Sequence, residues 1–569
     1  MSDFLKRHKV AVFLAVLTGF IFSFPQFHYR LSLGDDYQGI YRVINDDEPY
    51  YMTRAQDIVD GHYFLSNSLL YEHKNGMSMQ FFLPDLILAM PAKILGIGVY
   101  PLYHFYDFLL PLIGIFLTYF VFLKITENKN LSLLGSSSMY LVHYVFLFNR
   151  PISPQFNFLF VLTLTLILLK IFKDGEHGRK WWILAGMNYG VIFYIYTYFW
   201  TYMSTVIFLL LLYFLIKKKK IEAVTTAKIF FLGIGIGLPY FYQTYMATKL
   251  PVFEESVRRL GMLDTRVPSG IQIIIPAGIM LLLYAWRYRR KIKDISFLPA
   301  FMIIGLLADV INVNHHIITG KNLYFSSHYE LVSYFFIAFA LAYFIAGRMR
   351  DILKKREVVI LLYVFVCSLI VRNYLPILKY DLEKGIKRQN YEALFSWLNE
   401  NTKKDDVVFS YDGISGSVAS YTHNNVFYDT DALLFFMSDE EVLERFILNN
   451  FWREDFNVEF IRENFSAIFG FKYNAVAGKE QQKNKIRKLF NNQEVELEEL
   501  YYPPDEIERV LTLYQEYKEK NWIEELNQYK VDYFIAEKES ELDDFFKQQE
   551  FLRLKQKIGL FHIYEKVRD

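Results

Sequence analysis

Cysteine is almost absent from this sequence, since Cys367 is the only one among 569 residues. A single thiol excludes an internal disulfide and a zinc site built from clustered cysteines. An excess of either charge is also missing, because 62 lysines and arginines balance 61 aspartates and glutamates, for a formal net charge of +1. Without a global positive field, nucleic acid is not expected as a partner.

Glycine patterns that bind nucleotides are missing as well. Gly320-Lys321 lacks the upstream glycine of a phosphate-binding loop. Gly233, Gly235 and Gly237 lie in an apolar run with no strand before them, and their spacing favours close packing between helices. The sequence therefore offers no fingerprint for a nucleotide cofactor.

Apolar residues are plentiful, with 53% hydrophobic and 18% aromatic residues beside 22% charged ones. Mean hydropathy is only +0.14, which predicts two parts, one very apolar and one charged. A bilayer core of about 30 Å needs roughly 20 apolar residues in a helix. Runs near that length lie at 9–25, 105–123, 131–149, 155–172, 181–199, 201–216, 228–246, 270–286, 296–312, 330–347 and 357–372. The predicted fold is thus an α-helical polytopic membrane domain over residues 1–378, with about eleven transmembrane helices.

Basic residues fall in every second loop, which predicts the orientation. The N-terminus carries Lys6, Arg7 and Lys9, and no small-residue cleavage site follows the first apolar run, so an uncleaved first span is expected. By the positive-inside rule the N-terminus is cytoplasmic and the C-terminal domain is extracytoplasmic. The apolar stretch 81–98 would invert every later loop if it crossed the membrane, and it is therefore predicted to be interfacial or re-entrant.

From residue 379 to 569 the composition turns to mixed charge, and a soluble extracytoplasmic α/β domain is predicted. Expected helices lie at 391–401, 439–450 and 507–526, and expected strands at 406–410, 425–428, 531–536 and 560–564. Asp429-Thr430-Asp431 is interpreted as a turn after a strand. Metal binding by the two carboxylates on a sugar nucleotide is the alternative.

The first external loop, residues 26–104, carries the strongest motif. Asp46, Asp47 and Glu48 are adjacent and precede Pro49, and like charges this close repel unless a cation or donors compensate. A functional acidic cluster is predicted, while an ordinary helix start stays open as the alternative. A carboxylate there can take a proton from an acceptor or hold a divalent metal.

Cations on the same predicted face suit phosphate oxygens. Arg150 stands in a short loop that is otherwise uncharged, and Arg258 follows Glu254 at the i,i+4 spacing of a surface helix, which is its structural alternative. A further loop brings His315, His316 and Lys321 before His328 and Tyr329. These residues are predicted to bind phosphate, and the alternative is that they close the loop at the membrane interface.

The first loop resembles the glycosyltransferase-C superfamily, most closely the protein O-mannosyltransferase and lipid A aminoarabinose transferase group. Asp47, Glu48, Tyr51, Ala55, Ile58 and Gly61 stand in the register of that family's Asp-Glu motif, and Tyr71 to Lys74 is similar to its following segment. The sequence departs from the family after Lys74, where Asn75-Gly76 replaces two prolines, and in the loop 149–154, which has no carboxylate.

This resemblance implies an inverting transfer from a polyprenyl-phosphate-linked sugar on the outer face, with Asp47 as base or key acidic residue. The predicted function is therefore a membrane glycosyltransferase that uses Asp47, Glu48 and Asp46. Its partners would be a polyprenyl-phosphate sugar donor, a lipid, glycan or protein acceptor, and membrane lipids. The cofactor stays open, with a divalent metal on Asp46 and Asp47 as one alternative. A transporter or lipid flippase using Asp107, Asp309 and His143, and a non-catalytic polysaccharide-assembly protein, are the rival functions.

Overall fold

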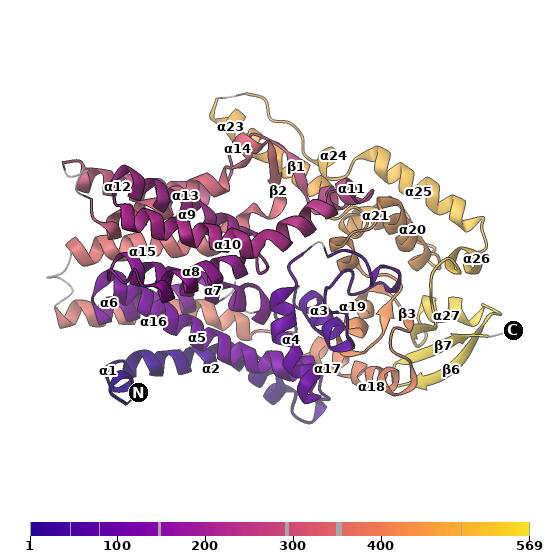
Figure 1. Ribbon diagram of the computed structural model, residues 1–569. Helices are drawn as coiled ribbons and strands as arrows, with labels where there is room; N and C mark the ends of the chain where they lie inside the picture. Colours follow the sequence, from indigo (N-terminus) through magenta and orange to yellow (C-terminus); the bar gives the residue numbers. More distant parts are fainter. Residues whose placement is uncertain are drawn as a thin grey trace.

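The computed structural model describes residues 2–45, 47–78, 80–145, 150–290, 295–348, 355–490 and 492–567. A long helical bundle forms one part of the molecule, and a domain with a small sheet covers one end of it (Figure 1). The bundle helices are α2 (Lys9–Leu33), α5 (Val99–Thr126), α6 (Lys129–Ser137) continued by η3 (Ser138–His143), η4 (Pro151–Phe156) continued by α7 (Asn157–Phe172), α8 (Arg179–Ile192), α9 (Thr197–Ile216), α10 (Lys220–Ala247), α12 (Ile271–Tyr288), α13 (Phe297–Val313), α15 (Glu330–Arg348) and α16 (Arg356–Leu378).

Each of the eleven predicted apolar runs overlaps one of these helical segments, and residues 146–149, at the end of the run predicted at 131–149, lie outside the described residues. Within the described part of the chain, nine helices are long and apolar enough to cross a membrane, so the protein is a multi-pass membrane protein. The other two segments, α6 with η3 and α8, are shorter. The 14 residues of α8 cover about 21 Å, and the chain turns before α9 instead of continuing to residue 199 as predicted.

Glycines bring α8 and α10 close together. A Cβ atom added to Gly233 would lie 2.1 Å from Tyr189 Cδ1, and one added to Gly237 would lie 2.8 Å from Phe193 Cδ2. Nothing lies within 4 Å of the equivalent position on Gly235. The predicted helix packing is confirmed for Gly233 and Gly237, and Gly235 takes no part in it.

The long first loop and two later loops gather at the end of the bundle next to the C-terminal domain, and the N-terminus lies at the other end (Figure 1). Their elements are α3 (Glu48–Asp60), α4 (Leu83–Leu95), α11 (Phe253–Arg259), β1 (Met262–Asp264), α14 (His316–Thr319), β2 (Lys321–Leu323) and η6 (Tyr324–Tyr329). Antiparallel pairing of β1 with β2 ties the two later loops together. At 13 residues, or about 20 Å, α4 is too short to cross a bilayer, in agreement with the interfacial prediction.

The C-terminal domain contains a five-stranded mixed sheet in the order β4-β3-β5-β7-β6. β3 (Val407–Phe409) runs parallel to β4 (Asn425–Val426) and β5 (Tyr533–Glu537), and β7 (Phe561–Lys566) and β6 (Leu552–Ile558) are added antiparallel. The other elements are α17 (Leu382–Gln389), α18 (Tyr391–Asn401), α19 (Asp412–Tyr421), η8 (Thr430–Leu434), α20 (Asp439–Asn449), α21 (Val458–Glu463), α22 (Phe465–Phe469), α23 (Lys472–Leu489), α24 (Glu498–Tyr501), α25 (Pro504–Lys518), α26 (Trp522–Leu526) and α27 (Glu541–Lys547).

The predicted α/β character of this domain is confirmed, but the helices α17, α19, α21, α22, α23, α24 and α27 were not predicted, and two other elements differ from the prediction. The helix expected at 507–526 is two helices, because the Asn521 side chain accepts a hydrogen bond from the Ile523 backbone and starts α26 anew. Strand β6 was not predicted. Its polar, largely exposed side chains are typical of an edge strand and hide the apolar alternation that identifies inner strands.

The first loop completes the core of the C-terminal domain. Leu69 accepts a backbone hydrogen bond of 3.0 Å from Val426, so the loop borders the sheet beside β4. Ile40, Tyr50 and Leu69 belong to one buried cluster with residues of the sheet and its helices. The loop and the domain therefore form one packed unit at the end of the bundle.

Candidate functional site

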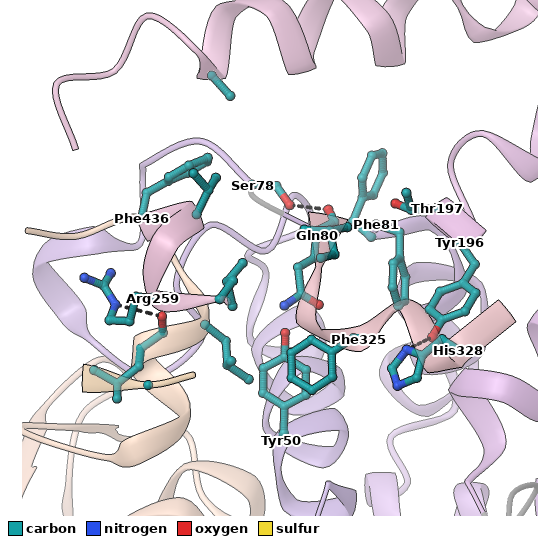
Figure 2. Close-up of a pocket in the computed structure, with 18 of the residues that line it drawn as sticks. Tyr50, Ser78, Gln80, Phe81, Tyr196, Thr197, Arg259, Phe325, His328 and Phe436 are labelled. Atoms are coloured by element: carbon teal, nitrogen blue, oxygen red, sulfur yellow. Dashed lines mark hydrogen bonds between the residues drawn. The ribbon is translucent and has the colours of Figure 1, made fainter. Parts of the chain in front are cut away.

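A cavity of about 500 Å³ lies where the first loop, the bundle and the C-terminal domain meet (Figure 2). Aromatic rings form much of its wall, including those of Tyr50, Phe81, Phe325 and Phe436. Its walls come from the start of α3, the turn between α8 and α9, the end of α10, α11, η6, η8 and α22. Three parts of the chain far apart in sequence thus close around one space.

Asp47 lines this cavity and directly precedes α3 as its N-cap residue. Its side chain is 62% exposed and accepts a hydrogen bond from Nη1 of Arg150, whose own side chain is 15% exposed. The Arg150 guanidinium lies 5.3 Å from the centre of the Tyr51 ring, a cation–π distance. The structure thus joins the predicted acidic residue to the predicted phosphate-binding arginine, while Asp46 lies outside the described residues.

Glu48 points away from the cavity although it is adjacent to Asp47. Its side chain is buried, and Oε2 accepts a hydrogen bond of 2.9 Å from the Ile44 backbone. Burial raises the pKa of Glu48 to about 7. Glu48 therefore holds the segment that leads into α3.

His328 is the member of the predicted histidine loop that lines the cavity. Its Nδ1 lies 2.6 Å from the Tyr196 hydroxyl, and the two side chains stand together at one side of the cavity (Figure 2). Tyr329, the next residue, is buried and exchanges a 3.0 Å hydrogen bond with Thr201 without lining the space. The bond to Tyr196 orients the His328 ring.

The other predicted phosphate-binding residues do not line the cavity and use their polar groups locally. His315 lies 3.2 Å from Thr319 Oγ1, His316 Nε2 lies 2.8 Å from the Val267 carbonyl, and Lys321 and Arg258 each lie 4.0 Å from Glu254. The i,i+4 pair expected for Arg258 is therefore present. Of the predicted site residues in this loop, His328 alone lines the cavity, and the others bind within the loop or to neighbouring segments.

Arg259 lines the cavity and was not predicted as a site residue. It is 1% exposed, pairs with Asp439 at 2.6 Å and donates to the backbone carbonyls of Leu433, Phe435 and Met437. Glu255, four residues before Arg259, accepts a hydrogen bond from the Asp439 backbone at 2.7 Å. Arg259 fastens α11 to the C-terminal domain and thereby shapes one wall.

Two buried ion pairs anchor the inner face of α3. Arg54 donates to Asp85 at 2.7 Å, and Lys74 pairs with Asp57; all four side chains are buried. Burial raises the pKa of Asp57 and of Asp85 to about 6 against the effect of the neighbouring cation. Lys74, the lysine of the segment 71–74, therefore forms its ion pair within the first loop.

Asp429 and Asp431 form the turn expected after the strand. Asp429 Oδ1 accepts a 2.8 Å hydrogen bond from the Asp431 backbone and starts η8. Asp431 also lines the cavity, so the C-terminal domain presents a carboxylate to the same space as Asp47. Among the described residues, which do not include Asp46, no three His, Cys, Asp or Glu side chains cluster as metal ligands would.

Neither the protein-family models nor the curated proteins include a match to this chain. Among solved structures, the chain is similar to the crystal structure of the Archaeoglobus fulgidus oligosaccharyltransferase tethered with an acceptor peptide containing the NVT sequon via a disulfide bond. Sequence identity is 10%, the match covers 94% of this chain and 70% of that chain, and the TM-score is 0.45. A likeness this distant does not identify an activity for this chain.

Proposed function

We propose that this protein is a membrane glycosyltransferase that moves a sugar from a polyprenyl-phosphate carrier to an extracytoplasmic acceptor. The observation that carries the proposal is the ion pair between Asp47, which lines the aromatic cavity, and Arg150, which does not line it. It places a carboxylate and a cation at one point, and transfer from a phosphate carrier needs both. Glycan, lipid and protein acceptors all fit the proposal.

Before a donor binds, Arg150 and Asp47 neutralise one another. A donor phosphate attracts the guanidinium strongly, because its forked donors match phosphate oxygens. Arg150 then contacts the phosphate and leaves Asp47 as a free carboxylate next to the reacting centre. The donor thus frees the base that acts on its acceptor.

Transfer then follows as an inverting displacement. The acceptor oxygen or nitrogen forms a bond to the anomeric carbon and gives its proton to Asp47. The bond between that carbon and the phosphate oxygen breaks, and its electron pair leaves with the polyprenyl phosphate, whose charge Arg150 stabilises. Glu48 positions Asp47 through the Ile44 segment. In this scheme Arg150 neutralises the leaving group, and a metal on Asp47 and Asp46 is the alternative arrangement.

The cavity suits a donor of this class. Its volume of about 500 Å³ falls within the roughly 300–1,000 Å³ typical of small-molecule sites. Aromatic rings such as Phe81 and Phe325 offer apolar surface to the first isoprene units and to the C–H face of a sugar. Polar groups on its wall, among them Gln80 and His328, can bind sugar hydroxyls.

The test follows release of free polyprenyl phosphate by the full-length protein in lipid nanodiscs, with a panel of polyprenyl-phosphate sugars and acceptors. Asp47→Asn is expected to lower turnover by about 10²–10⁴-fold, the usual contribution of a positioned acid–base group. Asp431→Asn changes another carboxylate of the same cavity and should keep most of the turnover. Equal turnover by wild type and Asp47→Asn would move the base elsewhere. Transport of labelled lipid without cleavage of a sugar–phosphate bond would instead favour a flippase.

A further inference from the structure

A second cavity, of about 220 Å³, lies within the C-terminal domain and takes no part in the proposed transfer. It is bordered by the start of α19, the end of α20 and the segment between α21 and α22. Its wall combines aromatic rings with side-chain amides, among them Tyr411, Trp452, Phe460, Asn449, Asn450 and Asn464. This combination differs from the first cavity, whose polar groups include carboxylates.

Asn449 is the residue that the fold does not explain. Its side chain is 4% exposed, and its Oδ1 has no hydrogen-bond partner in the part of the chain that the structure describes. A buried acceptor without a donor is unfavourable, so such an atom calls for a ligand or a functional role. The amides of Asn450 and Asn464, in contrast, donate to the carbonyls of Phe446 and Phe460 at 2.9 and 2.8 Å.

The aromatic wall beside Asn449 is rigid. Trp452 Nε1 donates to the Asn449 backbone carbonyl at 3.0 Å, which fixes the indole plane. The Arg453 guanidinium lies 4.6 Å from the Trp452 ring centre and 4.6 Å from that of Phe460. Its nitrogens donate to Asn450 Oδ1 at 3.1 Å and to Asp455 at 3.2 Å, so its charge is met within the protein.

We propose that this cavity is a non-catalytic carbohydrate site that holds one uncharged pyranose unit. The Asn449 side chain turns toward the cavity when the ligand enters, so that its oxygen accepts a hydrogen bond from a sugar hydroxyl, and the neighbouring amides supply further polar groups that both donate and accept. The C–H face of the ring packs on an aromatic wall, since its weakly positive hydrogens meet the negative face of the π system. Because Asp455 already neutralises Arg453, the ligand needs no negative charge. The volume is below the range of drug-sized ligands and suits a single sugar ring.

Helix α22 separates this site from the large cavity. Ser466 lines the large cavity, and the next residue, Ala467, lines the carbohydrate site. The Tyr428 hydroxyl donates to the Ala467 carbonyl at 2.7 Å and fixes the helix between them. The carbohydrate site is nevertheless defined by its own residues, and it can bind a sugar whether or not the large cavity carries out transfer.

Binding is measured on the full-length protein in lipid nanodiscs by saturation-transfer NMR, with methyl pyranosides of glucose, galactose, mannose and their N-acetylated forms, and with glucuronic acid. Wild type is expected to bind at least one neutral pyranoside. Asn449→Leu, which keeps the side-chain size and removes the amide, should weaken that binding by about tenfold, the effect of one lost hydrogen bond to a buried group. Asn484→Leu alters another buried asparagine of the same domain that does not line the cavity, and it should bind as wild type does.

Three outcomes overturn the proposal. They are the absence of binding by every neutral pyranoside, equal binding by wild type and Asn449→Leu, and binding of the uronic acid alone, which would make this an anion site. If Asn449→Leu does not fold, Trp452→Leu removes the aromatic wall instead and must weaken binding. Asp47→Asn should leave binding unchanged, so that failure of the transferase proposal and failure of this one are told apart.

Discussion

Helix α3 carries two kinds of ion pair, and they differ in how they meet solvent. Asp47, the residue just before the helix, lines the cavity, and its side chain is 62% exposed and pairs with Arg150. Arg54 lies about two turns further along the chain, and it and its partner Asp85 in α4 are 1% and 0% exposed. The first pair can exchange partners when a ligand arrives, whereas the second has no access to one. A single helix thus has a solvent-accessible ion pair at its start and buried ion pairs along its inner face.

Breaking the buried Arg54–Asp85 pair should have the largest effect, and the effect should be on stability. Arg54→Met leaves Asp85 buried without its cation, and the free energy of unfolding is expected to fall by about 3–5 kcal/mol. Denaturant or thermal unfolding in detergent measures the loss. Arg150→Met, at the exposed pair, should cost less than about 1 kcal/mol. A similar loss of stability in Arg54→Met and Arg150→Met would show that burial does not distinguish the two ion pairs.

A change in the Asp47–Arg150 pair should lower activity and leave stability unchanged. Arg150→Lys keeps the positive charge but removes the forked donors that bind two phosphate oxygens at once, so kcat/KM for the carrier-linked donor is expected to fall about tenfold. The stability of the variant should match that of wild type. Steady-state release of polyprenyl phosphate measures the change. Full activity in Arg150→Lys would mean that the cation acts only as a point charge, and lost activity with lost stability would make it an anchor like Arg54.

The stability of the protein should also depend on pH through Glu48, and this is the smallest of the expected effects. Its pKa in the folded protein is about 7, above the ordinary 4.5, so its contribution to stability is complete below about pH 4.5 and is lost as the pH rises through 7. Glu48→Gln keeps an acceptor for the Ile44 backbone and cannot ionise. Wild type should therefore lose stability relative to Glu48→Gln between about pH 5 and pH 8. Parallel stability curves for the two proteins would place the titration of Glu48 outside this range.

Much of the fold could be predicted because its signals are local. The length of an apolar run and the alternation of a strand are properties of neighbouring residues, and α18, α20 and the strands β3, β4, β5 and β7 follow from them. The turn after α8 and the edge strand β6 are not marked by such patterns. Tertiary packing decides both.

The candidate site could be predicted only in part. Asp47 and Arg150 were identified singly, but their pairing joins residues 103 apart in sequence. Arg259 meets Asp439 across 180 residues, which no spacing rule anticipates. The divergence of Asp47 and Glu48 was not predicted either. Asp47 pairs with Arg150, whereas Glu48 accepts a hydrogen bond from the Ile44 backbone, and the sequence does not show which of two adjacent carboxylates takes which partner.

The core shared by the first loop and the C-terminal domain has a consequence for biosynthesis. Leu69 is made long before its neighbour Val426, and the cluster around Ile40 and Tyr50 also includes Ile563 in strand β7. During translation, the loop that carries Asp47 lacks the C-terminal residues against which it packs in the folded protein. The first loop is therefore among the last parts of the molecule to reach its final structure, and a prematurely terminated chain would lack the residues that pack against it.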